Sequence, residues 1–414
     1  PSCFHVIENA KKQFLEHGFI QLEEKEHWNL EEGKSYFVER NGSSMIAFHL
    51  PKKDFQGFHI VASHSDSPTY RIKEQPEMSV EKHYTKLNIE RYGGMIPETW
   101  FDRPLSVAGR IIIEENGQIK DQLVNIDRDL MIIPNLAIHM SRSSNESKQL
   151  NPQKDLLPLC GGNLTKDGFE EMIAKESGVE KEDILSYDLF LYNRMRGTTL
   201  GINEEFVAAP KLDDLECAYS SIEGMLNAKL SKDYVTVCAV FDNEEVGSGT
   251  KQGAGSTFFP EVLKRISYLC GKNEEEYYMA VADSFMLSAD NAHAVHPNHQ
   301  DKTDPTNRPY INEGIVLKYN ASQKYTTDAN SAALVKYLCK KEKIKCQVFF
   351  NRSDMLGGST LGNILTGQVS IKAADIGLPQ LSMHSTYETA GCKDLDDMIT
   401  LMGSFYELGK EVQI

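Results

Sequence analysis

The sequence lacks a surplus of basic residues and lacks long apolar runs. Its 60 Asp and Glu outnumber its 44 Lys and Arg, which gives a net charge of -16. Nucleic-acid binding depends on cationic side chains that displace counterions, so nucleic acid is not an expected partner. No apolar run approaches the roughly 20 residues that a membrane-spanning helix needs, and the first residues contain no signal-peptide core. We therefore expect a cytoplasmic protein that has no membrane partner.

The chain also lacks paired cysteines. Its eight cysteines are scattered and form no C-x-x-C motif, which argues against a disulfide framework and against a zinc site built from thiolates. Apolar residues, in contrast, are plentiful. With 414 residues, of which 40% are hydrophobic, the chain can bury a large core in two or three domains.

Apolar strands alternate with amphipathic helices over much of the chain, and this pattern predicts a sheet that helices cover on both faces. We therefore predict an α/β fold, in which a mixed sheet is flanked by helices. Helices are predicted at 5–17, 166–175, 212–228, 256–270, 327–341 and 395–412, and strands at 44–50, 57–66, 234–241, 278–284, 314–319, 344–350 and 369–376.

The pattern changes to short strands with turn signals between residues 72 and 203. Within this stretch, Asn116-Gly117 is typical of the type I′ turn of a β-hairpin. We interpret residues 72–203 as a β-rich insertion into a catalytic domain formed by residues 1–71 and 204–414.

Polar residues follow several predicted strands or begin a predicted helix. In open α/β sheets, ligands bind beyond the carboxyl ends of the strands. Each motif alone has an ordinary explanation, because single histidines often serve packing and acidic pairs often cap helices. Together, however, carboxylates at an apolar sheet edge repel one another unless a cation compensates them, so the sequence indicates a metal centre. The residues concerned are His64, Asp66, Asp213, Asp214, Glu244, Glu245, Asp290 and His384.

Imidazole and carboxylate ligands without thiolates suit a catalytic zinc site, and manganese and cobalt are also compatible with them. Two histidines and three carboxylates match the needs of two divalent ions that share one carboxylate. Asp66 follows His64 by two residues and can orient its ring without touching metal. In the adjacent pair Glu244 and Glu245, one residue can bind an ion while the other exchanges protons with water.

Three rival motifs are weaker. The glycine-rich segment after Glu245 lacks the G-K-[ST] of a phosphate-binding loop. The segment VGSGT does not match the nucleophile motif G-x-S-x-G, so Ser248 is a poor candidate nucleophile. The segment HAVH at 293–296 lacks the glutamate of H-E-x-x-H, and its histidines are expected to pack in a loop or to line a substrate pocket.

Eight blocks spread along nearly the whole chain carry a more specific signal: ASHSDSP (62–68), TWFDRPLSVAGR (99–110), IPNLAIHMSR (133–142), KLDDL (211–215), FDNEEVGSGT (241–250), SADNAHAVHPN (288–298), GGSTLG (357–362) and MHSTYETAG (383–391). In these blocks the chain resembles the aspartyl aminopeptidase family of dinuclear zinc exopeptidases. The resemblance implies that Glu244 is the general base, that Asp66 orients His64, and that Asp213 bridges the two ions. The implied zinc ligands are His64, Asp213, Glu245, Asp290 and His384.

The resemblance also carries expectations about substrate and assembly. It implies that Lys318 meets an acidic substrate side chain and that His139 reaches the active site of a neighbouring subunit. The insertion would then be a dimerisation domain, and the homo-oligomer would be a tetrahedral dodecamer built from dimers.

We therefore predict a metalloaminopeptidase that removes N-terminal residues from peptides. Asp and Glu are favoured, and some members of the family prefer neutral apolar residues. The predicted nucleophile is a water held between the two ions, with Glu244 as its base. One alternative is an amidase or deacylase that acts on small molecules with the same scaffold. The other is a binding protein that keeps the metals for structure, and an intact Glu244 argues against it.

Overall fold

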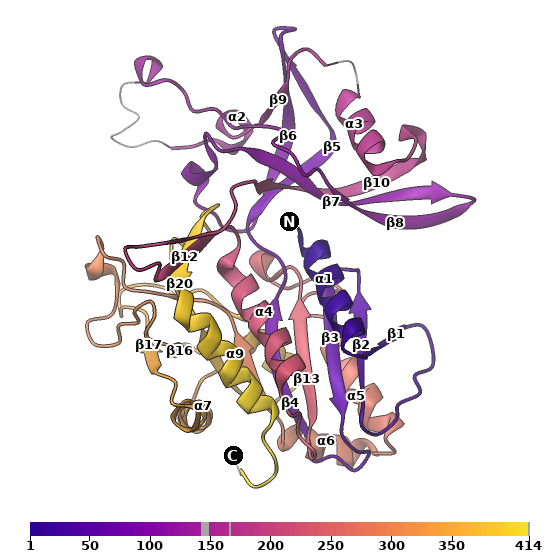
Figure 1. Ribbon diagram of the computed structural model, residues 1–414, viewed down its shortest axis with the longest axis vertical. Coiled ribbons are helices and arrows are strands. Elements are labelled where there is room, and N and C mark those ends of the chain that lie inside the picture. Colours follow the sequence, from indigo (N-terminus) through magenta and orange to yellow (C-terminus); the bar gives the residue numbers. More distant parts are fainter. Residues whose placement is uncertain (142–148, 165–166, 413–414) are drawn as a thin grey trace. The chain divides into compact units, whose positions relative to one another are not determined.

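The computed structural model describes residues 1–141, 149–164 and 167–412 (Figure 1). The chain divides into two compact units. Unit 1 comprises Pro1–His5, Ser67–Gly197 and His384–Tyr387, and unit 2 comprises Val6–Asp66, Thr198–Met383 and Glu388–Ile414. Among the described residues, no helix combines the length and the apolar character that crossing a membrane requires.

Unit 2 contains a nine-stranded mixed sheet in the order β1-β2-β3-β13-β4-β14-β18-β16-β17. Strands β13, β4, β14 and β18 run parallel in the middle, while β3 and β16 pair with them in antiparallel fashion. The bounds are β1 Ile20–Leu22, β2 Lys34–Arg40, β3 Ser44–Leu50, β4 Phe58–His64, β13 Val235–Phe241, β14 Phe285–Ala289, β16 Ile315–Lys318, β17 Cys346–Phe349 and β18 Lys372–Gly377.

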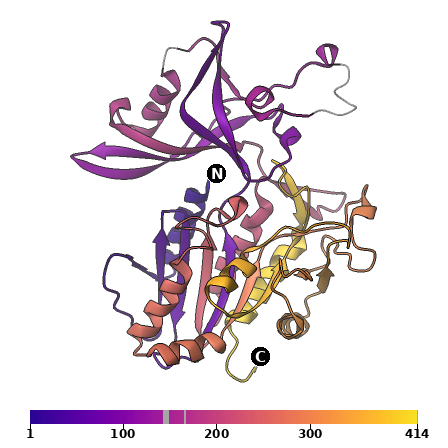
Figure 2. The ribbon, with the colours of Figure 1, turned by 180° about the vertical axis from the view of Figure 1, so that it is seen from behind.

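Both faces of this sheet are covered, because its central strands are apolar on both sides. Every residue of β4 and β13 is buried. Within β4, Val61 packs into one core, whereas Ile60 and Ala62 pack into the core on the other face. Helices α1, α4, α7 and α9 supply the first core, and α5, α6 and α8 supply the second, whose side faces the viewer in Figure 2. Their bounds are α1 Cys3–Glu16, α4 Leu212–Asn227, α5 Phe258–Leu269, α6 Glu274–Ala282, α7 Ala329–Glu342, α8 Leu361–Gln368 and α9 Cys392–Tyr406.

This arrangement confirms the predicted α/β class, but one predicted element is wrong. Residues 278–284, predicted as a strand, lie mostly in α6, and β14 begins only at Phe285. Helix α6 starts at a capping box: the side chain of Asn273 accepts a hydrogen bond from the Glu276 amide, and the Glu276 side chain accepts one from the Asn273 amide. This reciprocal cap satisfies two amides of the first turn, so the apolar run that follows continues as helix before it becomes strand.

Unit 2 also contains a small five-stranded sheet in the order β11-β12-β20-β19-β15. Here β15 pairs in parallel with β19, and β20 pairs in antiparallel fashion with β12 and β19. The bounds are β11 Thr198–Leu200, β12 Phe206–Ala209, β15 Ala292–His293, β19 Pro379–Leu381 and β20 Glu388–Gly391.

Unit 1 is built on a six-stranded antiparallel sheet in the order β8-β7-β10-β5-β6-β9, with its own apolar core. Asn116 and Gly117 join β7 to β8 with φ angles of 54° and 74°, which confirms the predicted hairpin turn, since a type I′ turn needs positive φ at both positions. Helix α3, Gly168–Ser177, corresponds to the helix predicted from Lys166, a residue outside the described ranges. The strands are β5 Thr69–Val80, β6 Tyr84–Tyr92, β7 Leu105–Glu115, β8 Gln118–Asn125, β9 Leu159–Gly161 and β10 Ile184–Asn193, and a short helix, α2, covers Pro152–Asp155.

Candidate metal centre

The carboxyl ends of three neighbouring parallel strands bring the predicted site residues of unit 2 together. His64 is the last residue of β4 and lies opposite Phe241, the last residue of β13. Asp290 directly follows β14, the neighbour of β4 on its other side. Glu244 and Glu245 lie in a short 3₁₀ helix, Glu244–Val246, just after β13. This is the sheet edge at which ligands of α/β proteins gather.

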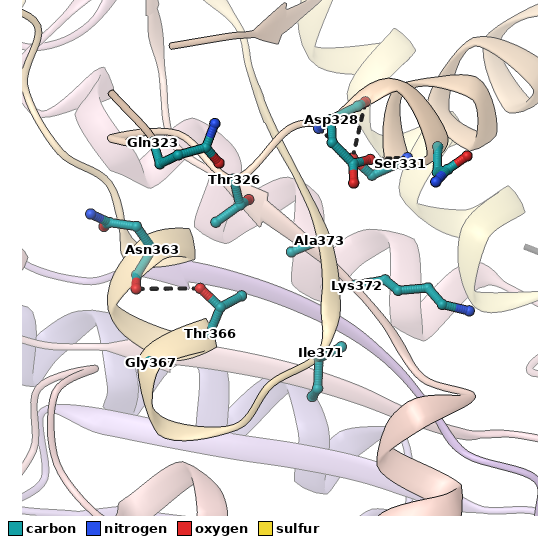
Figure 3. Close-up of a pocket in the computed structure, with 11 residues that line it drawn as sticks. Gln323, Thr326, Asp328, Ser331, Asn363, Thr366, Gly367, Ile371, Lys372 and Ala373 are labelled. Carbon is teal, nitrogen blue, oxygen red and sulfur yellow. Dashed lines mark hydrogen bonds between the residues drawn. The ribbon is translucent and has the colours of Figure 1, made fainter. Parts of the chain in front are cut away.

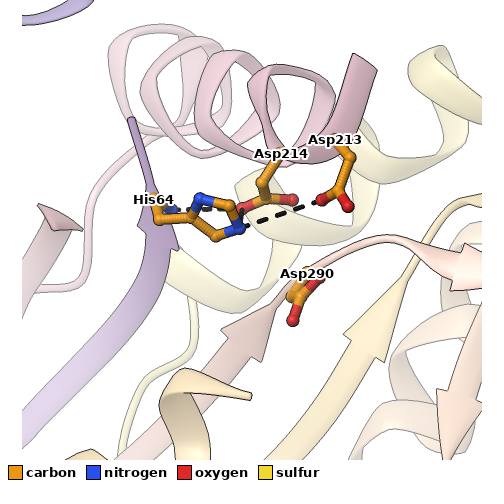
Figure 4. Close-up of side chains that lie close together, drawn as sticks. All are labelled: His64, Asp213, Asp214 and Asp290. Atoms are coloured by element: carbon orange, nitrogen blue, oxygen red, sulfur yellow. Dashed lines mark hydrogen bonds and ion pairs between the residues drawn. The ribbon is translucent and has the colours of Figure 1, made fainter. Parts of the chain in front are cut away.

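Four of these side chains form a buried cluster (Figure 4). His64, Asp213, Asp214 and Asp290 each offer one ligand atom, and these atoms lie within 4.8 Å of one another. The Nε2 atom of His64 lies 3.8 Å from Asp213 Oδ1 and 4.0 Å from Asp214 Oδ2. Their exposed fractions do not exceed 9%, so the four groups share an environment that water scarcely reaches.

The first turn of α4 is distorted where it carries the two aspartates. Asp213 and Asp214 have non-helical backbone angles, and the peptide bond between them is cis. The Asp213 amide donates to Glu388 Oε2 at 3.0 Å, and the His64 amide donates to Asp214 Oδ2 at 3.1 Å. These two bonds tie the turn to β20 and to the end of β4, and they hold both carboxylates beside His64.

Asp66 connects the histidine to the glutamate pair. Its carboxylate accepts the Glu244 amide at 3.1 Å and the Glu245 amide at 3.2 Å. Asp66 Oδ1 also lies 3.3 Å from His64 Nδ1. His64, Glu244 and Glu245 form a second group whose ligand atoms lie within 4.8 Å of one another. One buried carboxylate therefore positions both the imidazole ring and the loop that presents the two glutamates.

Burial and mutual repulsion shift the pKa values of these groups strongly. Burial, reinforced by neighbouring carboxylates, raises the pKa of Asp214 and Glu245 well above the usual range. Burial also raises the pKa of Glu244, to about 7. For Asp290, burial raises the pKa although Lys318 opposes the shift. Burial alone would lower the pKa of His64, but Asp214, Asp66 and Glu244 together hold it well above its usual range.

These side chains fit a divalent cation. Several carboxylates gathered in a low-dielectric environment cost free energy unless protons or a cation neutralise them. In addition, Asp214 Oδ1 is buried and has no hydrogen-bond partner among the described residues. Imidazole nitrogen and carboxylate oxygen without thiolate is the donor set of a catalytic zinc site. His64, Asp213 and Asp290 are thus suitable ligands, and Asp214 lies among them.

The structure places the other predicted site residues as follows. Lys318, at the end of β16, is 3% exposed. Its ammonium donates to the carbonyl of Asp290 at 2.7 Å and to that of Asn291 at 3.2 Å. His384 belongs to unit 1, whereas the other predicted ligands belong to unit 2, and its place in the centre stays a prediction. His139 is exposed in unit 1, within the 3₁₀ helix Ile138–Met140.

Sequence reasoning missed two residues that organise the cluster and left a third without a role. Asp214 was named among the polar residues of the predicted centre but not among the implied zinc ligands, and it lies inside the group. Glu388 holds the Asp213 amide, and Asn291 donates to both Leu212 O and Glu216 Oε2. Glu388 and Asn291 could have been suspected because they lie in two of the sequence blocks that carry the resemblance, 383–391 and 288–298. The groups that Glu388 and Asn291 contact could not be predicted from the sequence, because these contacts depend on the fold.

Comparison with known proteins agrees with this geometry. The family model described as aminopeptidase I zinc metalloprotease (M18) matches residues 1–406. A relative from Clostridium acetobutylicum, a probable M18 family aminopeptidase 2, is 45% identical over 99% of this chain and 96% of its own length.

Solved structures give the same result. The cryo-EM structure of the Ape4 and Nbr1 complex contains a chain with a TM-score of 0.95 and 37% identity, covering 98% of this chain and 83% of that one. The dodecamer of mApe1 from S. cerevisiae gives a TM-score of 0.85 at 27% identity, covering 98% of this chain and 93% of that one. The resemblance predicted from the sequence blocks is thereby confirmed: the chain belongs to the M18 family of aminopeptidase I zinc metalloproteases and is an aminopeptidase.

Proposed function

We propose that the protein removes single N-terminal residues from peptides at a centre of two divalent ions, most simply zinc, with Glu244 as the general base. The observation that carries this proposal is the arrangement around Asp66, whose carboxylate accepts the amides of Glu244 and Glu245 while it lies beside His64. That arrangement supports different roles for the two glutamates: Glu245 binds an ion, and Glu244 accepts and donates protons.

Five residues would hold the ions. We propose His64 and Asp290 for one ion, Glu245 and His384 for the other, and Asp213 as the bridge. When bound, divalent ions supply Lewis acidity, which makes water a better nucleophile at neutral pH and polarises a peptide carbonyl. The contribution of the chain is to fix the ligands in place, which the hydrogen bonds of Asp66, Asp214 and Glu388 support.

Glu244 carries out the proton transfers in this proposal. It takes a proton from the attacking water as the water oxygen bonds to the carbonyl carbon. It then returns that proton to the nitrogen of the leaving amine as the C–N bond breaks. Burial raises the pKa of Glu244 above that of an exposed glutamate, which makes its carboxylate a stronger base for the first of these steps.

The experiment that tests this role is the substitution Glu244→Gln. Because only the proton acceptor is lost, we expect bound metal to stay at the wild-type level while kcat falls at least about 100-fold. The matched control is Glu275→Gln, which changes an exposed glutamate of α6. Metal analysis and release of free amino acid from peptides, against N-acetylated peptides as a second control, provide the readout. Full activity in Glu244→Gln would refute the role, and cleavage of the acetylated peptides would favour an amidase or deacylase instead.

We further propose a preference for N-terminal Asp and Glu. Lys318 is the predicted contact for the acidic side chain, and its ammonium lies 3.7 Å from Asp290 Oδ2, so its charge is placed directly behind a proposed metal ligand. The buried contacts of this lysine restrict how far it can reach, and its direct contact with substrate stays a prediction.

We also propose a homo-oligomer built from dimers through unit 1, as a tetrahedral dodecamer, with His139 reaching the active site of a neighbouring subunit. The dodecameric state of the S. cerevisiae relative supports oligomerisation. So does the segment around His139, where Leu136, Ile138 and Met140 are exposed by 52%, 46% and 77%, since clustered exposed apolar side chains often mark an interface. The cytoplasmic location stays a prediction.

A further inference from the structure

Two cysteines that form no C-x-x-C motif in the sequence meet in the fold of unit 2. Cys339 lies in the last turn of α7 and is 1% exposed, and Cys346 is the first residue of β17 and is half-buried. Cys346 packs against the apolar core that contains Cys339, and the two thiols form a hydrogen bond with each other. Sulfur atoms in such contact need only a small side-chain rotation to reach bonding distance.

Helix α7 holds Cys339 in place because both of its ends are fixed. The helix begins beside a cavity of about 680 Å³ (Figure 3), where the Ser331 amide donates to Asp328 Oδ1 at 2.8 Å and the Asp328 amide donates to Ser331 Oγ at 2.9 Å. At its other end, Lys343 has a φ of 59° and the Ile344 amide donates to the carbonyl of Cys339 at 2.8 Å. A left-handed residue of this kind ends a helix, and the chain turns back toward β17 directly after it.

Cys346 begins a strand at the edge of the sheet. Strand β17 ends the order of the nine-stranded sheet and pairs in parallel with β16, where Cys346 lies opposite Ile315. An edge strand has ladder hydrogen bonds on one side only, so it opens at a lower free energy than a central strand. A covalent bond between Cys346 and Cys339 would therefore tie the start of a weakly held strand to a fixed helix.

The two thiols differ in acidity and in exposure. The hydrogen bond from Cys339 lowers the pKa of Cys346 although burial opposes the shift, and the charge of Lys336 acts in the same direction as the bond. The same hydrogen bond, together with burial, raises the pKa of Cys339. Cys346 is thus the thiol that ionises first, and it is also the more exposed of the two. An ionised, accessible cysteine beside a second thiol is the usual arrangement for reversible oxidation.

Other half-buried cysteines of the chain lack this combination. Burial raises the pKa of Cys160 and of Cys270 to about 11, so both remain protonated thiols at neutral pH. Protonated thiols react slowly with oxidants. Cys270, at the end of α5, therefore serves as a reference for an ordinary cysteine of similar burial.

We propose that Cys339 and Cys346 form a modification site, at which hydrogen peroxide converts the two thiols into a disulfide that a thiol reductant opens again. The Cys346 thiolate attacks one peroxide oxygen, the O–O bond breaks, and the other oxygen leaves as water after it takes a proton, so that Cys346 becomes a sulfenic acid. The Cys339 sulfur then attacks the Cys346 sulfur, the S–O bond breaks, and the Cys339 proton leaves with the hydroxyl group as a second water. The two sulfurs lose two electrons in total, and these electrons reduce the peroxide.

The closed form holds the start of β17 against α7. The reaction uses none of the proposed metal ligands and does not depend on the proposed peptidase function. It gives the protein a state that responds to the oxidant and is reversed by reduction.

The first test treats the folded protein with hydrogen peroxide, blocks the remaining thiols with iodoacetamide, and digests the protein with trypsin without a reductant. Trypsin cleaves after Lys336, Lys340, Lys345 and Arg352, so residues 337–340 and 346–352 leave as separate peptides unless a disulfide joins them. We expect mass spectrometry to find the joined peptides, and dithiothreitol to separate them. The variants Cys339→Ala and Cys346→Ala should not give the joined peptides, and the matched control Cys270→Ala should give them at the wild-type level.

The fold should speed this reaction, because it holds the two sulfurs together. The joined peptides should form at least about tenfold faster in the folded protein than in concentrated urea. Equal rates would overturn the proposal. So would folded wild type in which the two peptides stay separate, whether the thiols are unmodified or Cys346 is oxidised to a sulfinic acid.

The second test measures hydrogen exchange at the backbone amides of β17 in reduced and oxidised protein. The disulfide should slow this exchange at least about threefold, because it opposes the opening of the strand. Peroxide-treated Cys339→Ala should exchange as fast as its untreated form. Equal exchange in reduced and oxidised wild type would show that the disulfide does not hold β17, and would overturn that part of the proposal.

Discussion

His59 should make the protein sensitive to mild acid. It is the second residue of β4, is 2% exposed, and stacks on Tyr234 with ring centroids 4.0 Å apart. Its Nδ1 atom has no hydrogen-bond partner among the described residues. Burial lowers the pKa of His59 to about 3, because an imidazolium ion at this position would lose its hydration without gaining an acceptor.

The direction of the effect follows from comparing the folded and unfolded states. The unfolded chain binds a proton with a pKa near 6.5, and the folded chain binds it only near pH 3. Above pH 6.5 neither state is protonated and the stability is unaffected; as the pH falls from 6.5 toward 3, the unfolded state gains protons and stability is lost. At pH 5 the loss is about 2 kcal/mol, from about 1.4 kcal/mol for each pH unit below 6.5.

The variant His59→Phe tests this value, since phenylalanine keeps the stacking on Tyr234 and cannot be protonated. Urea unfolding of both proteins at equal concentration, at pH 8 and pH 5, gives the free energy of unfolding under each condition. The buried carboxylates titrate in both proteins, so the change in the difference between variant and wild type isolates His59. We expect the variant to gain about 2 kcal/mol relative to wild type between pH 8 and pH 5. If the free energies of unfolding of variant and wild type changed equally between pH 8 and pH 5, the folded protein would accommodate a charged His59, and the prediction would be refuted.

Three further predictions concern the centre and the assembly. Asp66→Asn keeps the shape but loses a charged acceptor for the Glu244 and Glu245 amides, so zinc affinity should fall about 10- to 100-fold in a chelator competition; unchanged affinity would remove Asp66 from its positioning role. Lys318→Leu leaves Asp290 without its ion pair, so the free energy of unfolding should drop by about 3–5 kcal/mol and any preference for N-terminal Asp or Glu should weaken. If Lys318→Leu were as stable as wild type, the ion pair with Asp290 would not contribute to folding; if it were as selective, Lys318 would not contact the substrate side chain. Met140→Glu adds charge to the exposed apolar segment and should shift the protein to smaller assemblies in light scattering, whereas a wild-type mass would place the interface elsewhere.

Local sequence patterns determined much of this protein. The apolar residues of β4 and β13 predict buried strands, and a period of three to four residues in α4 and α9 predicts helices that cover them. Both patterns depend only on which side chains must leave water. The spacing of polar residues after the strands similarly predicts His64, Glu244, Glu245 and Asp290 as site residues, because parallel strands end at a common edge of the sheet.

Tertiary structure decided the features that join distant parts of the chain. The helix at 278–282 is not such a feature, because the nearby cap of Asn273 and Glu276 is a local pattern that the strand prediction overlooked. That Asp66 holds the amides of Glu244 and Glu245, and that Asp214 lies within the cluster, both depend on contacts between residues far apart in sequence. The physical reason is that a hydrogen bond or a carboxylate cluster requires positions fixed within a few tenths of an ångström, and only the packed sheet and its helices provide that precision.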